Sequence, residues 1–147
     1  MKQSDVIVIG AGPAGMAAAA TAAEHGLSVT LLDEQARPGG QIYRDVDRVA
    51  GKRGDMLGPD YTYGTALTGA LARAPVDLVT GAVVWAIEDS FRVSYTSRNV
   101  ASQVEADRLI LATGALERPM PVPGWTLPGV MTAGAGQILL KQSGVVA

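Results

Sequence analysis

The chain has no cysteine among its 147 residues. This absence excludes a disulfide framework, a cysteine-ligated zinc or iron–sulfur site and a redox-active dithiol within these residues. Charge is also scarce, since 18% of the residues are Asp, Glu, Lys or Arg and the formal net charge is −2. A balance this close to neutral argues against a general surface for nucleic acid or for anionic membranes.

Long hydrophobic runs are missing as well. The alanine-rich stretch over residues 14–23 is too short to span a bilayer and is closed by Glu24 and His25. No signal peptide is recognisable before the first apolar run, so the expected location is the cytoplasm. The length and a hydrophobic fraction of 48% predict one globular domain over residues 1–147.

The most informative stretch is VIVIGAGPAG, residues 6–15. Its apolar start is typical of a strand buried in a parallel sheet, and its proline stands where the first turn of a helix tolerates one. In a dinucleotide-binding turn, the first glycine permits the turn, the second lets the backbone approach a pyrophosphate, and the third lets the helix pack on the strand. The phosphates would then lie on the free N–H groups of the helix. The predicted cofactor-binding residues here are Gly10, Gly12, Pro13, Ala14 and Gly15.

An acidic pair follows the second predicted strand, Leu27–Leu32. Asp33 lies 23 residues after Gly10, close to the spacing of about 20 at which an acid accepts hydrogen bonds from ribose hydroxyls. We therefore add Asp33 and Glu34 to the predicted cofactor site. Because no arginine follows at once, a 2′-phosphate is disfavoured, whereas FAD and NAD both remain possible.

The rest of the chain predicts an α/β fold, a parallel sheet with an inserted antiparallel β-meander. Residues 45–60 carry charges of both signs and are expected to form an irregular, solvated loop. Trp85 and Trp125 could be neighbours of the flavin, but ordinary packing is expected for both. Met16 and Met131 are expected in the core rather than in a redox-active role. The further predicted helices are Tyr63–Arg73 and about 133–142, and the further predicted strands are Val76–Val79, Ala82–Ile87, Phe91–Tyr95, Val100–Ala106 and Arg108–Ala112.

Two stretches, ARPGGQIYR (36–44) and LILATGALERP (109–119), resemble the FAD domain of two-dinucleotide-binding flavoproteins, the glutathione-reductase and thioredoxin-reductase superfamily. The resemblance implies a Rossmann-like FAD-binding domain and favours FAD as the cofactor. It places a glycine pair near the ribityl and pyrophosphate groups, a strand of the meander (80–87) at the adenine, and an Ala-Thr-Gly turn under the cofactor. The residues implied in these roles are Gly39, Gly40, Gln41, Val84, Ala112, Thr113 and Gly114.

A closer resemblance rests on GGQIYR, LGPDY (57–61) and ERPMPVPGWTLPGVMTAGAGQ (117–137). These stretches are similar to the larger, FAD-containing subunit of opine oxidases, hydrogen cyanide synthases and amino-acid dehydrogenase complexes. The resemblance covers only the N-terminal third of that architecture, so the fold is expected to be incomplete relative to the family. A missing C-terminal portion, other subunits or a second copy of the chain would then complete the FAD site.

Three functions remain open from the sequence. The chain could be the FAD-binding part of an oxidoreductase whose flavin accepts electrons from an amino acid or an opine-like donor, directly or through a partner subunit. It could also be a non-catalytic nucleotide-binding or assembly module, or an NAD-binding dehydrogenase domain, which the meander disfavours. No catalytic acid, base or metal-ligand set is predicted. Arg44 and Arg118 either pair with the pyrophosphate, line the flavin, or are solvated.

Overall fold

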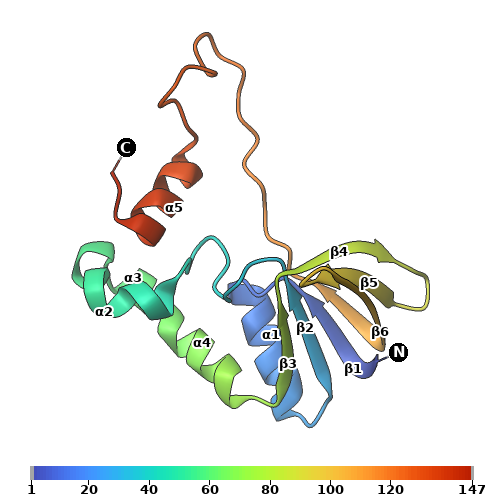
Figure 1. Cartoon of the computed structure of the whole chain (residues 1–147). Helices are drawn as coiled ribbons and strands as arrows, with labels where there is room; N and C mark the ends of the chain where they lie inside the picture. The colour runs from blue at the N-terminus through green and yellow to red at the C-terminus, as the bar shows by residue number, and fades with distance from the viewer. Residues whose placement is uncertain (1, 147) are drawn as a thin grey trace.

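A computed structural model describes residues 2–146. Six strands form one sheet in the order β3-β2-β1-β6-β5-β4 (Figure 1). The first three strands and the C-terminal part of β6 run parallel, whereas β4, β5 and β6 form the antiparallel meander. This arrangement confirms the predicted α/β class and the inserted meander. The strands are β1 (Lys2–Ile9), β2 (Val29–Asp33), β3 (Val76–Thr80), β4 (Ala82–Ile87), β5 (Arg92–Ser97) and β6 (Val100–Leu111).

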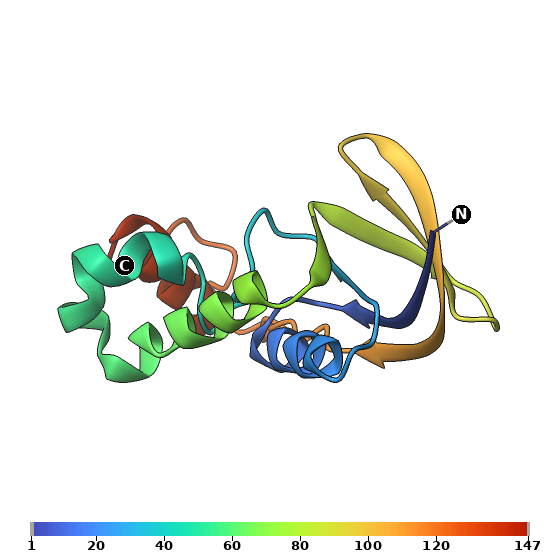
Figure 2. The ribbon, with the colours of Figure 1, turned by 90° about the horizontal axis from the view of Figure 1, so that it is seen from below.

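The parallel sheet lies between a helical layer and the meander (Figure 2). Side chains of β1 alternate, so Val6 and Val8 pack against the helices while Ile7 packs under the meander. On the helical side, α1 contributes Met16, which is fully buried as expected. The helices are α1 (Pro13–Glu24), α2 (Val46–Leu57), α3 (Pro59–Thr62), α4 (Gly64–Arg73) and α5 (Ala133–Ser143).

The prediction of an irregular loop over residues 45–60 is wrong, because this stretch forms α2 and the start of α3. Val46 and Val49 lie one helical turn apart and are both 1% exposed. They bury against Tyr61 of α3 and form a small core of their own. Asp47, Arg48, Lys52 and Asp55 are exposed, so a polar composition concealed an amphipathic helix.

The two strands predicted on either side of Asp107 are one strand, β6. Its N-terminal half pairs with β5 up to Glu105, and its residues from Val104 to Leu111 pair with β1. The backbone ladders on the two edges overlap, so they hold the strand continuous through a polar residue that breaks its apolar pattern.

The connection from the sheet to α5, residues 112–132, is a long exposed excursion (Figure 1). Trp125 and Met131 lie on it and are 46% and 41% exposed, and Trp85 on β4 is 61% exposed. The expectation of packing is therefore wrong for these three side chains. Trp125 and Met131 lie on the exposed connection, and Trp85 lies at an exposed position of β4, where exposure alternates along the strand. Within residues 2–146, no helix combines the length and apolar character needed to cross a bilayer.

Candidate functional site

The glycine-rich turn lies where β1 ends and α1 begins. Gly10 has φ +102°, and a Cβ added to it would lie 2.3 Å from the carbonyl oxygen of Ala112. A Cβ added to Gly15 would lie 1.7 Å from the carbonyl oxygen of Gly10. Both glycines are thus required by the fold itself, the first for a left-handed turn and the second for the close approach of helix and strand.

Gly12 differs from these two glycines. Its φ of −72° and ψ of −177° suit any residue, and an added Cβ would meet only the Cα of Gly40, at an ordinary contact distance of 4.0 Å. No contact among residues 2–146 therefore requires glycine at this position. Gly12 is also the N-cap of α1, it supplies no side-chain cap, and the first turn of α1 contains no acidic residue. The N–H groups and the positive dipole end of α1 are left free for an anion.

The glycine pair of the second loop packs directly on the first. Gly40 has φ +61°, and its added Cβ would lie 2.9 Å from the Cα of Gly12. The N–H of Gly39 donates to the carbonyl of Ala11 over 2.8 Å. These contacts bring two loops that are distant in sequence into one cradle around the start of α1.

Asp33 stands at the end of β2 with 8% exposure. Its Oδ2 accepts from the N–H of Ala11 at 2.5 Å, and its Oδ1 accepts from the N–H of Gln35 at 2.7 Å. Each oxygen keeps a second lone pair for a ribose hydroxyl. The neighbouring Glu34 is exposed. The structure thus gives Asp33 a loop-organising role that was not predicted from the sequence. The end of β2 lies beside the glycine turn in a βαβ unit, and this placement could have indicated the role.

The Ala-Thr-Gly turn follows β6 and closes the cradle. The N–H of Ala112 donates to the carbonyl of Ile9 over 2.8 Å, which extends the β1–β6 ladder into the turn. Gly114 has φ +73°, a conformation that favours glycine. The side-chain amide of Gln41 donates to the carbonyl of Ala115 over 2.9 Å, so the second loop and this turn are linked. Thr113, between Ala112 and Gly114 in the chain, is exposed.

Val84 is half-buried on β4, along which buried and exposed positions alternate. The N–H of Gly81, just before β4, donates to the carbonyl of Gln35 over 3.0 Å, which attaches the meander to the loop after Asp33. The ladder with β5 shifts register between Val84 and Ala86. The residue without a partner in this ladder is Trp85, whereas Val84 is paired with Tyr95. The adenine contact predicted for Val84 stays a prediction.

Arg44 and Arg118, whose roles the sequence left open, differ in their surroundings. Arg44 is half-buried and donates from a terminal nitrogen to Oε1 of Gln35 over 2.6 Å. Arg118 is exposed on the connection to α5. The surface alternative therefore fits Arg118, whereas Arg44 lies beside the loop that follows the predicted ribose-binding acid.

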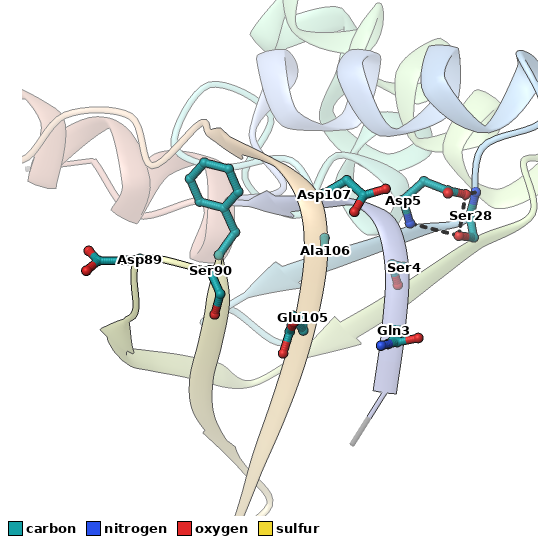
Figure 3. A pocket seen from close by; sticks show the side chains of 10 residues that line it. Gln3, Ser4, Asp5, Ser28, Asp89, Ser90, Glu105, Ala106 and Asp107 are labelled. Atoms are coloured by element: carbon teal, nitrogen blue, oxygen red, sulfur yellow. Dashed lines mark hydrogen bonds between the residues drawn. The ribbon is translucent and has the colours of Figure 1, made fainter.

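A cavity lies away from the glycine turn. It measures about 530 Å³ and opens beside the N-terminal half of β1, away from the carboxyl ends of the parallel strands (Figure 3). Its walls carry Asp5, Asp89, Glu105 and Asp107. A dense negative charge of this kind repels phosphate. The hydroxyl and the N–H of Ser28 donate to the carboxylate of Asp5, and these hydrogen bonds lower the pKa of Asp5.

The comparisons with known proteins agree with this geometry. A family model described as pyridine nucleotide-disulphide oxidoreductase matches residues 4–143. An opine oxidase subunit of Agrobacterium tumefaciens (strain Ach5) is 52% identical over 97% of this chain and 30% of that protein. The HcnB subunit of hydrogen cyanide synthase from Pseudomonas protegens is 43% identical over 95% of this chain and 30% of that protein.

A solved structure, that of L-proline dehydrogenase from P. horikoshii, superposes with a TM-score of 0.80 over 98% of this chain and 29% of its own. Its sequence identity is 23%, so this likeness concerns the fold. The chain spans about 30% of the length of these relatives. The fold is Rossmann-like, and what is similar to the relatives is a part of each of them.

Proposed function

The chain belongs to the pyridine nucleotide-disulphide oxidoreductase family, and from this premise we propose that its glycine cradle binds FAD as part of a flavin-dependent oxidoreductase. The observation that carries the proposal is the steric freedom at Gly12. Gly10 and Gly15 are explained by contacts within the chain, but Gly12 is not. A ligand pressed against the backbone at that position supplies the missing reason for glycine.

The residues around Gly12 fit the parts of such a dinucleotide. The N–H groups at the start of α1, at Ala14 and Gly15, would hold the pyrophosphate. Asp33 and the exposed Glu34 would accept from the ribose of the adenosine half. Gly40, Gln41 and the Ala112–Gly114 turn would border the ribityl half, and the backbone at Val84 would meet the adenine. Pro13 fixes the first turn of α1 without occupying a donor that the ligand needs.

When bound, a flavin supplies the redox chemistry by accepting a hydride or electrons. We propose an amino acid or an opine-like compound as the electron donor, directly or through a partner subunit. The support is that relatives include opine oxidase and hydrogen cyanide synthase subunits and that the fold of a proline dehydrogenase is similar. This chain's own residues bind and orient the cofactor, and none is assigned as a catalytic acid or base.

A further polypeptide is proposed to complete the site. Among the described strands, the C-terminal part of β6 after Glu105 pairs with β1 alone, so its other edge is open. Leu111 at the end of this edge is 63% exposed, and Leu116 just beyond it is 92% exposed. An open apolar strand end of this kind is covered in stable assemblies. The cover would be the remaining part of a longer protein, another subunit or a second copy.

The first test is the visible absorbance spectrum of the purified chain, taken before and after acid release of bound chromophore. Flavin bands near one per chain, identified as FAD after release, are expected. If the protein is colourless and takes up neither FMN nor FAD on addition, the proposal fails for this chain. Tight binding of NADH without retained flavin would instead favour the NAD-binding alternative.

A non-catalytic assembly module is the second candidate, and the open β6 edge and its exposed leucines favour it. Anaerobic mixing of the flavin-loaded chain with proline and with an opine separates the two candidates. If a donor bleaches the flavin absorbance, the flavin on this chain accepts electrons from that donor directly, which supports the oxidoreductase function. The assembly module is supported if dithionite reduces the bound flavin but neither donor does. This must hold for the chain alone and for the chain with a co-purifying partner.

A further inference from the structure

We propose that a second site on this chain, an arginine pocket between the loop after β2, the start of α2 and the end of α5, binds a small oxyanion of the carboxylate or phosphate class. The pocket measures about 300 Å³, and three arginines line it, Arg37, Arg44 and Arg48. Residues 37 and 48 lie outside the predicted dinucleotide cradle. The proposal does not depend on FAD binding.

The pocket has more hydrogen-bond donors than acceptors. Arg44 uses one terminal nitrogen on Oε1 of Gln35. Its Nε is buried and has no hydrogen-bond partner among the described residues. A buried N–H without an acceptor is uncommon in a folded protein, because it has lost water and gained nothing in return. An oxyanion in the pocket would supply the acceptor.

The charges in the pocket are also unbalanced. Asp45 is the single carboxylate among the residues that line it. Its Oδ1 lies 3.5 Å from Arg37 and its Oδ2 lies 3.0 Å from Arg48, so it is shared between two cations. Three guanidinium groups against one carboxylate leave a local excess of two positive charges on a chain whose net charge is −2. Such an excess favours an anionic ligand.

The wall formed by the end of α5 limits where the anion can lie. Arg48 donates over 2.6 Å to the carbonyl of Gln142 in the last turn of α5, so part of its donor capacity is fixed. Arg37 is 58% exposed at its side chain and is free to turn toward a ligand. We therefore expect Arg37 and Arg44 to make the direct contacts and Arg48 to hold the pocket in shape. Planar guanidinium groups match the two oxygens of a carboxylate or phosphate.

The probes are inorganic phosphate and acetate, added to the full 147-residue chain at constant ionic strength while isothermal titration calorimetry records binding. Arg37→Gln and Arg44→Gln should each weaken binding by about tenfold or more, as expected for losing a charge-assisted contact. Lys52→Gln is the matched control, since Lys52 is exposed on α2, carries the same charge and does not line the pocket. It should change the affinity less than about twofold.

Circular dichroism melting of each variant shows whether it folds, and Arg37→Gln keeps the test valid if Arg44→Gln does not fold. Equal weakening in all three variants would reduce the effect to general charge attraction and overturn the proposal. Phosphate binding that ignores both arginine variants would place the anion at the start of α1 and overturn it too. Absence of measurable binding by either probe would also overturn it.

Repeating the titration on FAD-loaded protein distinguishes two sources of the oxyanion. If FAD abolishes phosphate binding, the dinucleotide's own phosphate reaches the arginines. If binding persists, the pocket takes a separate anion, such as a carboxylate-bearing metabolite. This second titration is interpreted only after the arginine variants have placed the anion in the pocket. If the chain does not bind FAD, the result of the first experiment still stands.

Discussion

The buried carboxylate of Asp33 accepts a hydrogen bond from the backbone N–H of Ala11, joining the end of β2 to the turn after β1. The loop that would hold ribose and the loop that would hold pyrophosphate are therefore one hydrogen-bonded unit. An acid at this position prepares the cradle as well as contacting a ligand.

Asp33→Asn is expected to destabilise the chain by about 1–3 kcal/mol, because a charged acceptor of two backbone N–H groups is replaced by an amide. Urea unfolding measures the change. Glu34→Gln is the control, because Glu34 is exposed, and it should stay within about 0.5 kcal/mol of the parent. Equal stability of the two variants would contradict the loop-organising role of Asp33.

Gly12→Ala is expected to leave the free energy of unfolding within about 0.5 kcal/mol of the parent and to abolish FAD uptake. Among the described residues, the nearest atom to the added methyl group is the Cα of Gly40 at 4.0 Å. The methyl group would stand where we propose that the ligand approaches the backbone. Gly15→Ala should instead destabilise the fold by about 3 kcal/mol, since its methyl group collides with the carbonyl of Gly10. Urea unfolding and flavin titration check both variants. Normal FAD uptake by a folded Gly12→Ala protein would remove the main support for the proposed function.

Tyr61→Phe is expected to cost about 1 kcal/mol, because the phenol donates to the carbonyl of Arg44 over 2.7 Å beneath α2. Burial, assisted by the charge of Asp45, raises the pKa of Tyr61 above its ordinary value of 10.0. The folded state therefore prefers the neutral phenol. The stability that this preference adds is complete at a pH below the pKa of Tyr61 in the unfolded chain. It is lost as the pH rises through the pKa of Tyr61 in the folded chain.

An ultraviolet titration of tyrosinate tests this directly. One tyrosine should ionise at a higher pH in the folded parent than in the urea-unfolded chain. This high-pH ionisation step should be absent in Tyr61→Phe. A high-pH step that survives the substitution would assign the raised pKa to another tyrosine.

Glu117 is expected to stabilise the start of α5 as long as its carboxylate is ionised. The hydroxyl of Thr132 and the N–H of Gly134 donate to its carboxylate, and together they lower the pKa of Glu117 from its ordinary value of 4.5. This contribution is present above the unfolded pKa and is lost as pH falls through the lowered one.

Nuclear magnetic resonance can follow the amide of Gly134 through that titration. Its chemical shift should move at a pH below 4.5 and should be independent of acid in Glu117→Gln. Amide exchange at Gly134 should be faster in the variant throughout. A midpoint at or above the ordinary value would show that the carboxylate does not cap α5.

Much of the fold follows from local sequence. The apolar run before Gly10, the proline at the start of α1 and the spacing to Asp33 are short-range features, and they predicted the first βαβ unit correctly. The later strands were also located, except that two of the predicted strands are the single strand β6. Errors concentrate where partners distant in sequence decide the outcome, as in α2, which buries Val46 and Val49 only because Tyr61 lies against them.

The sequence by itself determined the α/β class, the family resemblance and the set of residues around the glycine turn. Tertiary structure alone decided that β6 is one strand, because two neighbours share its edges. It also decided that Trp85 and Trp125 face solvent and that Arg37 and Arg44 share a pocket. Local patterns report what each residue prefers, whereas burial, clashes and unpaired donors depend on what the folded chain brings beside it. The difference is clearest at Gly12 and Gly15, identical in sequence and separable only by the atoms that surround them.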